Sequence, residues 1–361
     1  MKKFTGLFLF FLTMTFHSFS QDDSPFNFTA GIDLYYAYDF NKPLDRDRQY
    51  VTQAARHNEF NLNWGFIKAT FDNDKIRANL GLQTGTYPIF NYVNESSDLL
   101  RLIAEANAGV RITDQIWIDA GIMPGHIGYE STFSFDNEVY TRSLLAENTP
   151  YYQTGIQLSA AVSEDFDVRF LVLNGWQNIA ETNNAKSVGL QLNYRLNDKL
   201  VLNYSNYLGN ESTVQGQKKI RFYNDFYARY DIQDDWHVVV QIDYGTQEQL
   251  FSEDQGHIFA IMGLTQYRIS ERFHVAARIE HFNDNKEILV STATPNGFKN
   301  TNVGMSFDYI PVPYVKCRLE ARSFFSPDEI YNAGENNEKN DFVIVGSIAV
   351  DLNRKVFITA D

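Results

Sequence analysis

The chain has little of several features that commonly define a protein class. Cys317 is the one cysteine in 361 residues, so no internal disulfide can form, and no His/Cys cluster has zinc spacing. After the first twenty residues, no window approaches the roughly 20 apolar residues that a membrane-spanning helix needs. The formal net charge of −14 argues against a nucleic-acid partner, which requires a basic face. No Pro-, Gly- or Ser-rich linker and no run of like charge divides the chain, so we expect one domain.

The N-terminus predicts export. Lys2 and Lys3 precede an apolar run that ends at Phe16, and small residues stand just before Gln21. This order of basic, apolar and small residues is typical of a cleaved signal peptide, here residues 1–20. The alternative is a membrane anchor, but the apolar run is too short to span a bilayer comfortably. Cleavage removes two lysines and no carboxylate, so the mature chain carries a net charge of −16.

Aromatic residues and alternation dominate the remainder. The chain holds 29 Phe, 21 Tyr and 4 Trp. Apolar and polar residues alternate over stretches of about ten, the pattern of membrane strands that face lipid on one side and a lumen on the other. Near the start, Ile32 and Leu34 fall on one face, while Asp33 and Tyr35 fall on the opposite one. The same alternation recurs at 76–83, 102–111, 188–195, 236–245 and 315–322.

Short and long connections alternate along the chain. Tight polar turns are expected at 72–74, 113–115, 163–165, 197–199, 233–235, 270–272 and 311–313. Long polar loops are expected near 41–57, 86–99, 124–152, 177–186, 209–219, 246–256, 283–297 and 325–340. Seven turns and eight loops join sixteen strands, with bulges expected in 60–71 and 258–269, where the alternation changes phase. Short periplasmic turns with long outer loops are typical of outer-membrane barrels.

The predicted fold class is therefore all-β: a transmembrane antiparallel up-and-down barrel of about 16 strands. It forms a single domain over 21–361, with strands over about 28–352 and a short tail at 353–361. A soluble sandwich is the main rival, but the polar face carries too many charges for a dry core, whereas in a wide barrel that face lines water. The chain also places aromatic residues beside the short turns, as a membrane girdle requires: Phe71, Phe166, Tyr194, Tyr230, Trp236, Phe273, Tyr309 and Tyr314.

The chain resembles the OmpL-like β-barrel porin family over essentially the whole mature sequence. Besides the train of strands, the resemblance is carried by Pro124 to Glu130, by Leu145 to Tyr152, by Arg278-x-Glu280 and by Arg318-x-Glu320-x-Arg322. It implies an outer-membrane barrel with pore activity and says little about substrate.

Loop 124–152 is the longest connection and follows the fifth predicted strand. In porins of similar size the loop in this place folds inward and narrows the pore. The candidate constriction residues are the loop acids Glu130, Asp136, Glu138 and Glu147 and the lumen-facing Arg77, Arg111 and Arg169 of nearby strands. Acids facing arginines would set a transverse field across the pore. The alternative is an ordinary surface loop, with arginines that pair with their neighbours.

A second charged patch lies on the later strands and consists of Arg278, Glu280, Lys316, Arg318, Glu320 and Arg322. It could sort ions or bind an anionic solute, or it could be a salt-bridge lattice that braces the barrel. The interleaving of both signs favours bracing.

The function predicted from these patterns is passive diffusion of small hydrophilic solutes or ions through a water-filled lumen, with a mild cation preference suggested by the acidic chain. The alternatives are a non-conducting barrel, acting as an adhesin or as part of a surface or secretion complex, and, much less favoured, an enzyme. His237, His257 and His274 form no recognisable catalytic constellation, and we expect no catalytic, metal or cofactor site. Expected partners are outer-membrane lipids, the barrel-assembly machinery and further copies of the chain, with both termini in the periplasm.

Overall fold

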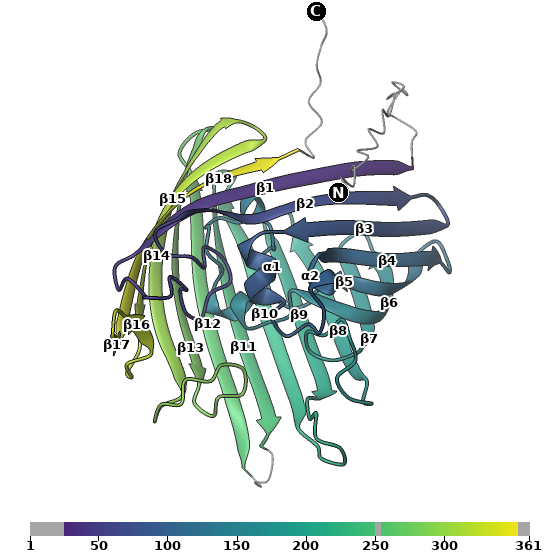
Figure 1. Ribbon diagram of the computed structural model, residues 1–361. Helices are drawn as coiled ribbons and strands as arrows, with labels where there is room; N and C mark the ends of the chain where they lie inside the picture. The colour runs from purple at the N-terminus through teal and green to yellow at the C-terminus, as the bar shows by residue number, and fades with distance from the viewer. Residues whose placement is uncertain (1–24, 250–253, 353–361) are drawn as a thin grey trace, which may run out of the picture.

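The computed structural model describes residues 25–249 and 254–352, and the predicted signal peptide and the tail at 353–361 lie outside these residues. Sixteen antiparallel strands of the described chain close a barrel, with each strand beside its neighbour in sequence and β1 paired with β18 (Figure 1). The strands are β1 (Phe26–Asp39), β2 (Phe60–Asp72), β3 (Ile76–Thr84), β4 (Ile103–Arg111), β5 (Ile116–Pro124), β6 (Tyr152–Ser163), β7 (Phe166–Leu173), β8 (Ser187–Asn197), β9 (Leu200–Asn210), β10 (Ile220–Gln233), β11 (Trp236–Glu248), β12 (Gln255–Arg268), β13 (Phe273–Asp284), β14 (Phe298–Val312), β15 (Val315–Phe325) and β18 (Asn340–Asp351). The predicted fold class is confirmed.

The alternation in the sequence sorts side chains between the two faces of the barrel. Ile32 and Leu34 on β1 point outward and are 42% and 46% exposed, while Asp33 and Tyr35 between them are buried inside. The same outward row of apolar side chains continues on the later strands, for example at Ile279. Such a continuous apolar exterior would be unstable in water and is what a bilayer covers.

The predicted girdle residues lie at the short-turn end and several point outward. Tyr194, Tyr230, Trp236, Phe273 and Tyr309 are all between 39% and 43% exposed. Rings of Tyr and Trp at this level suit a membrane–water interface, where the apolar body meets lipid and the polar atom meets water.

Seven short turns join the strands where the sequence predicts them, with one shift. Strand β14 continues to Val312, so the last turn lies at Pro313 and Tyr314 rather than at 311–313. The bulge expected in 60–71 is present, because the β1–β2 register shifts between Asp33 and Leu34. The bulge expected in 258–269 is wrong: β12 pairs with both neighbours without any shift. Both faces of β12 carry apolar residues there. The alternation of apolar and polar residues is therefore lost without any extra residue in the strand.

The long loops carry the remaining elements: α1 (Thr86–Asn91), α2 (Asp98–Arg101), the 3-10 helix η1 (Ser134–Asp136), α3 (Leu144–Glu147) and a small hairpin of β16 (Tyr331–Ala333) and β17 (Asn336–Glu338). No helix in the described part of the chain is long and apolar enough to cross a membrane.

Candidate functional site

The connection between β5 and β6, residues 125–151, folds into the barrel, and we call it the inserted loop. Its base is closed by a hydrogen bond from the backbone N–H of Gly125 to the carbonyl of Tyr151 at 2.9 Å. Its apolar residues Leu144 and Leu145 join one buried cluster with Met262 and Leu264, which point inward from β12. The inner face of β12 is apolar because the loop, rather than water, covers it.

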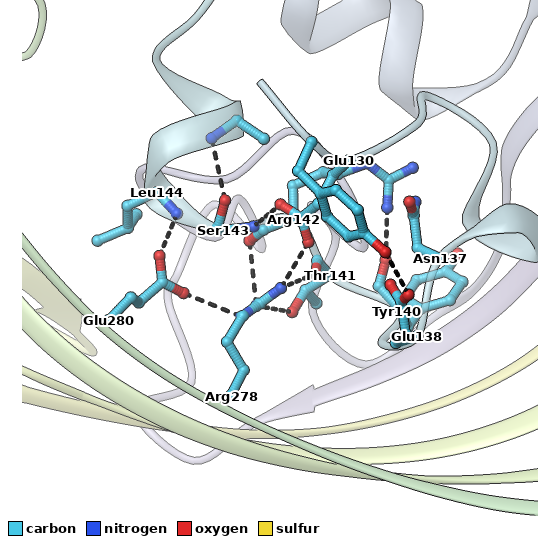
Figure 2. A network of polar contacts seen from close by, with 12 residues as sticks. Glu130, Asn137, Glu138, Tyr140, Thr141, Arg142, Ser143, Leu144, Arg278 and Glu280 are labelled. Atoms are coloured by element: carbon cyan, nitrogen blue, oxygen red, sulfur yellow. Dashed lines mark hydrogen bonds and ion pairs between the residues drawn. The ribbon is translucent and has the colours of Figure 1, made fainter. Parts of the chain in front are cut away.

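Charged side chains of β13 and β15 hold the backbone of the inserted loop, and Figure 2 shows two of them, Arg278 and Glu280 of β13. The Glu280 carboxylate accepts the backbone N–H of Leu144 at 2.5 Å, and Glu320 accepts that of Thr141 at 3.1 Å. Arg318 donates to the carbonyl of Asn137 at 2.7 Å. Because these wall groups satisfy loop amides and carbonyls that water cannot reach, the loop is fixed in one position.

Ion pairs reinforce this attachment. Arg278 lies 3.0 Å from Glu130 of the loop and 3.1 Å from Glu280 of its own strand. Arg322 pairs with Glu280 at 2.5 Å and donates to the carbonyl of Arg142 at 2.7 Å. The side chains of these ion pairs are at most 1% exposed, so each charge depends on its partner.

The six residues of the second predicted patch thus lie together, but they contact more than one another. Arg318 pairs with Asp308 of β14, and Lys316 donates to the carbonyl of Phe135 in the inserted loop. Cross-strand pairs and loop attachment share the same side chains. The sequence could not indicate the second role, because Glu320 and Thr141 are 179 residues apart.

Three of the four predicted loop acids bind residues outside the inserted loop. Glu130 binds Arg278, and Glu138 lies 2.9 Å from the His237 ring. Glu147 accepts hydrogen bonds from the backbone N–H and hydroxyl of Thr52, at 3.0 and 2.6 Å. Burial raises the pKa of Glu147 to about 7, although the Thr52 bonds oppose that rise. Asp136 remains exposed.

The three predicted arginines lie on the other side of the lumen, on β3, β4 and β7, near the short turns. Arg77 forms an ion pair with Asp119 at 2.5 Å. The guanidinium carbons of Arg77 and Arg111 lie 4.5 and 5.8 Å from the centre of the Trp117 ring. Arg169 faces the lumen and is exposed. The structure therefore groups the arginines with each other and not with the loop acids.

Sequence reasoning missed the polar contacts around Glu138. Glu138 accepts the Tyr129 hydroxyl at 2.6 Å in addition to its contact with His237. Burial opposes ionisation of Glu138, but these two contacts outweigh it and lower its pKa. These contacts tie the loop to β11. His237 is 99 residues from Glu138, so no local pattern signalled the contact.

Two cavities flank the inserted loop. One of about 470 Å³ lies between the loop and β2 to β4, with Trp64, Phe66 and the Lys68–Glu105 ion pair in its lining. Another of about 720 Å³ opens near the short turns beside Glu138, His274 and Lys316. The loop therefore narrows the interior without filling it.

A closed barrel of sixteen strands with an apolar exterior, a charged interior and a loop inside defines an outer-membrane barrel of the porin class. The family model "Putative beta-barrel porin-2, OmpL-like" matches residues 25–352, and the chain belongs to this family. No curated protein matches the sequence.

Solved porin structures share the fold at very low sequence identity. The anion-selective porin from Comamonas acidovorans has a TM-score of 0.60 at 9% identity, covering 90% of this chain and 99% of that one. OmpT of Vibrio cholerae gives 0.58 at 10% identity, with 90% and 97% covered. A mutant of the Rh. blastica porin gives 0.52 at 12% identity, with 90% and 99% covered. These similarities establish the fold.

Proposed function

We propose that the protein is an outer-membrane porin through which small hydrophilic solutes and ions diffuse passively. The observation that carries the proposal is the exposed, charged wall that faces the inserted loop near the short turns. Side chains of β1, of β8 to β11, of β13 and of β15 hold the loop, while Arg111, Asp167, Arg169 and Arg195 near the short turns stay exposed. A polar, exposed wall opposite a fixed loop is what a water-filled passage with a defined narrow point requires.

In this proposal the inserted loop is the constriction. The loop side contributes Asp136, and the opposite side contributes Arg77, Arg111 and Arg169. A passing solute would meet a transverse field between them. The acids Glu130, Glu138 and Glu147 act indirectly, since their contacts set where the loop lies.

The cellular setting follows the same proposal. The chain is exported by cleavage after residue 20, inserted by the barrel-assembly machinery with both termini in the periplasm, and surrounded by outer-membrane lipid, singly or as a homo-oligomer. We propose no enzymatic role. His237 and Glu138 do meet the distance criterion for a catalytic pair, but the contacts of Glu138 serve to fasten the loop.

Single-channel conductance of the refolded mature chain in a planar bilayer tests the proposal. Folding is verified first by heat-modifiable migration on a gel. Steady open-channel steps are expected. Silence from correctly folded protein would overturn the open-pore function and favour a non-conducting barrel, an adhesin or an accessory part of a surface complex.

A further inference from the structure

The arginines near the short turns form one continuous row across neighbouring strands. In the strand register, Arg111 lies opposite Trp117, Trp117 opposite Ser159, and Ser159 opposite Arg169. Arg77 reaches into this row, because its guanidinium donates to the Ser159 hydroxyl at 3.1 Å. The five neighbouring strands β3 to β7 thus bring three guanidinium groups to one stretch of the inner wall.

Two more arginines extend the basic surface. Arg195 on β8 lies opposite Val201, and Val201 lies opposite Arg229 on β10. Arg229 pairs with Asp231 at 3.1 Å, but Arg195 is exposed and points into the lumen two residues beyond Asn193. The basic wall therefore continues from β3 to β10.

Most of these charges are not neutralised by a carboxylate. Arg77 and Arg229 each have one partner, Asp119 and Asp231. Over residues 25–249 and 254–352, no carboxylate forms an ion pair with Arg111, Arg169 or Arg195. Arg111 donates instead to the backbone carbonyls of Asp74 and Asp114.

Fewer acidic groups than arginines lie on this part of the inner wall. Two exposed carboxylates lie beside the row: Asp72 is opposite Arg77 in the strand register, and Asp167 is two residues before Arg169 on β7. The carboxylates of the short turns, such as Asp114 and Glu164, face bulk solvent, where salt screens them over roughly 10 Å. Three of the loop acids are held by His237, Arg278 and Thr52. On the inner face of β2 to β10 near the short turns, the five arginines therefore outnumber the carboxylates, which are Asp72, Asp119, Asp167 and Asp231.

We propose that this basic wall makes the pore select for small anions over cations, and that Arg111, Arg169 and Arg195 carry the selectivity. The inference rests on the proposed porin function and reverses the cation preference that the net charge suggests. Charges inside a low-dielectric channel act on a passing ion far more strongly than charges on the outer surface, so the local wall outweighs the total charge.

The test is the zero-current potential of the refolded mature protein in a potassium chloride gradient. Its sign is expected to report chloride preference. The triple variant Arg111→Gln, Arg169→Gln, Arg195→Gln is expected to lower the chloride-to-potassium permeability ratio at least about threefold. The matched control Lys42→Gln, Lys218→Gln, Lys286→Gln removes the same charge from exposed loop positions and should leave the ratio unchanged.

The possible failures are distinguishable. No conductance from folded protein would overturn the porin function itself. Conductance with potassium preference, or a ratio that the arginine variant leaves unchanged, would overturn the anion inference while the porin function stands. An equal change in both triple variants would assign the selectivity to net charge and also reject the arginine wall.

Discussion

The carboxylate of Glu280 on β13 accepts the backbone N–H of Leu144 at 2.5 Å and also pairs with Arg322 at 2.5 Å. One side chain thus joins the barrel wall to the first turn of α3 in the inserted loop. Since both contacts are buried, the position of the loop depends on a charge that has no access to water.

Glu280→Gln is expected to destabilise the protein by about 3 kcal/mol, because Arg278 and Arg322 lose a shared buried carboxylate. Urea unfolding in detergent micelles, followed by unheated gel migration, measures the change. Glu335→Gln, at an exposed loop position, is the control and should cost almost nothing. Equal midpoints for the two variants would show that Glu280 does not anchor the loop.

Glu147 is expected to make stability depend on pH. Its pKa is raised from 4.5 to about 7, so the folded protein holds this proton more tightly than the unfolded chain does. The contribution is fully present below about pH 4.5 and is lost as pH rises to about 7. Glu147→Gln removes this loss, so its stability relative to the parent should increase between pH 5 and pH 8. Parallel pH profiles for parent and variant would contradict the assignment, and Glu164→Gln on a short turn controls for net charge.

Gly125→Ala is expected to disturb the base of the inserted loop. A Cβ at this position would lie 1.7 Å from the carbonyl oxygen of Pro150, so the backbone must move. Overpacking of this kind costs about 1–3 kcal/mol. The readout is the temperature at which the folded gel band is lost. Gly346→Ala has open space around its Cβ and should keep the parent value. A similar loss in both variants would attribute the effect to the replacement of glycine in general.

Leu319→Arg tests which face of the barrel meets lipid. Leu319 lies midway along β15, points outward and is 56% exposed. An arginine near the bilayer centre costs about 2–4 kcal/mol. Unfolding from lipid vesicles measures the cost, and Val214→Arg, on a loop and 45% exposed, should be neutral. Equal stability for both variants would mean that Leu319 does not face lipid.

Most of the barrel could be predicted because its determinants are local. The face of each residue follows from its neighbours, as for the outward Ile32 and Leu34 on either side of the inward Asp33. Each short turn interrupts the alternation within a few positions. The prediction failed at β12, because Met262 and Leu264 face the inserted loop rather than water. Inward apolar residues occur where the inserted loop covers the wall. The sequence of the strand alone does not show where such a loop will lie.

The site could be predicted only in part. Arg77, Arg111 and Arg169 were identified from strand phase alone, which fixes the face of each residue. The partners of the loop acids could not be identified, since they depend on contacts between distant parts of the chain. Glu147 meets Thr52, 95 residues earlier, and Glu130 meets Arg278, 148 residues later.

The order of the chain has a consequence for assembly. The inserted loop follows β5, but many of the side chains that hold it come from later strands, among them β11, β13 and β15, and the Glu320 contact with Thr141 spans 179 residues. A nascent barrel that ends before β13 offers the loop amides neither Glu280 nor Glu320. The narrow point of the lumen is thus among the last features to acquire its shape, close in time to the moment when β18 meets β1. Closure of the barrel and positioning of the loop then occur together. A protein whose final strands fail to pair would therefore have neither a closed wall nor a pore of defined width.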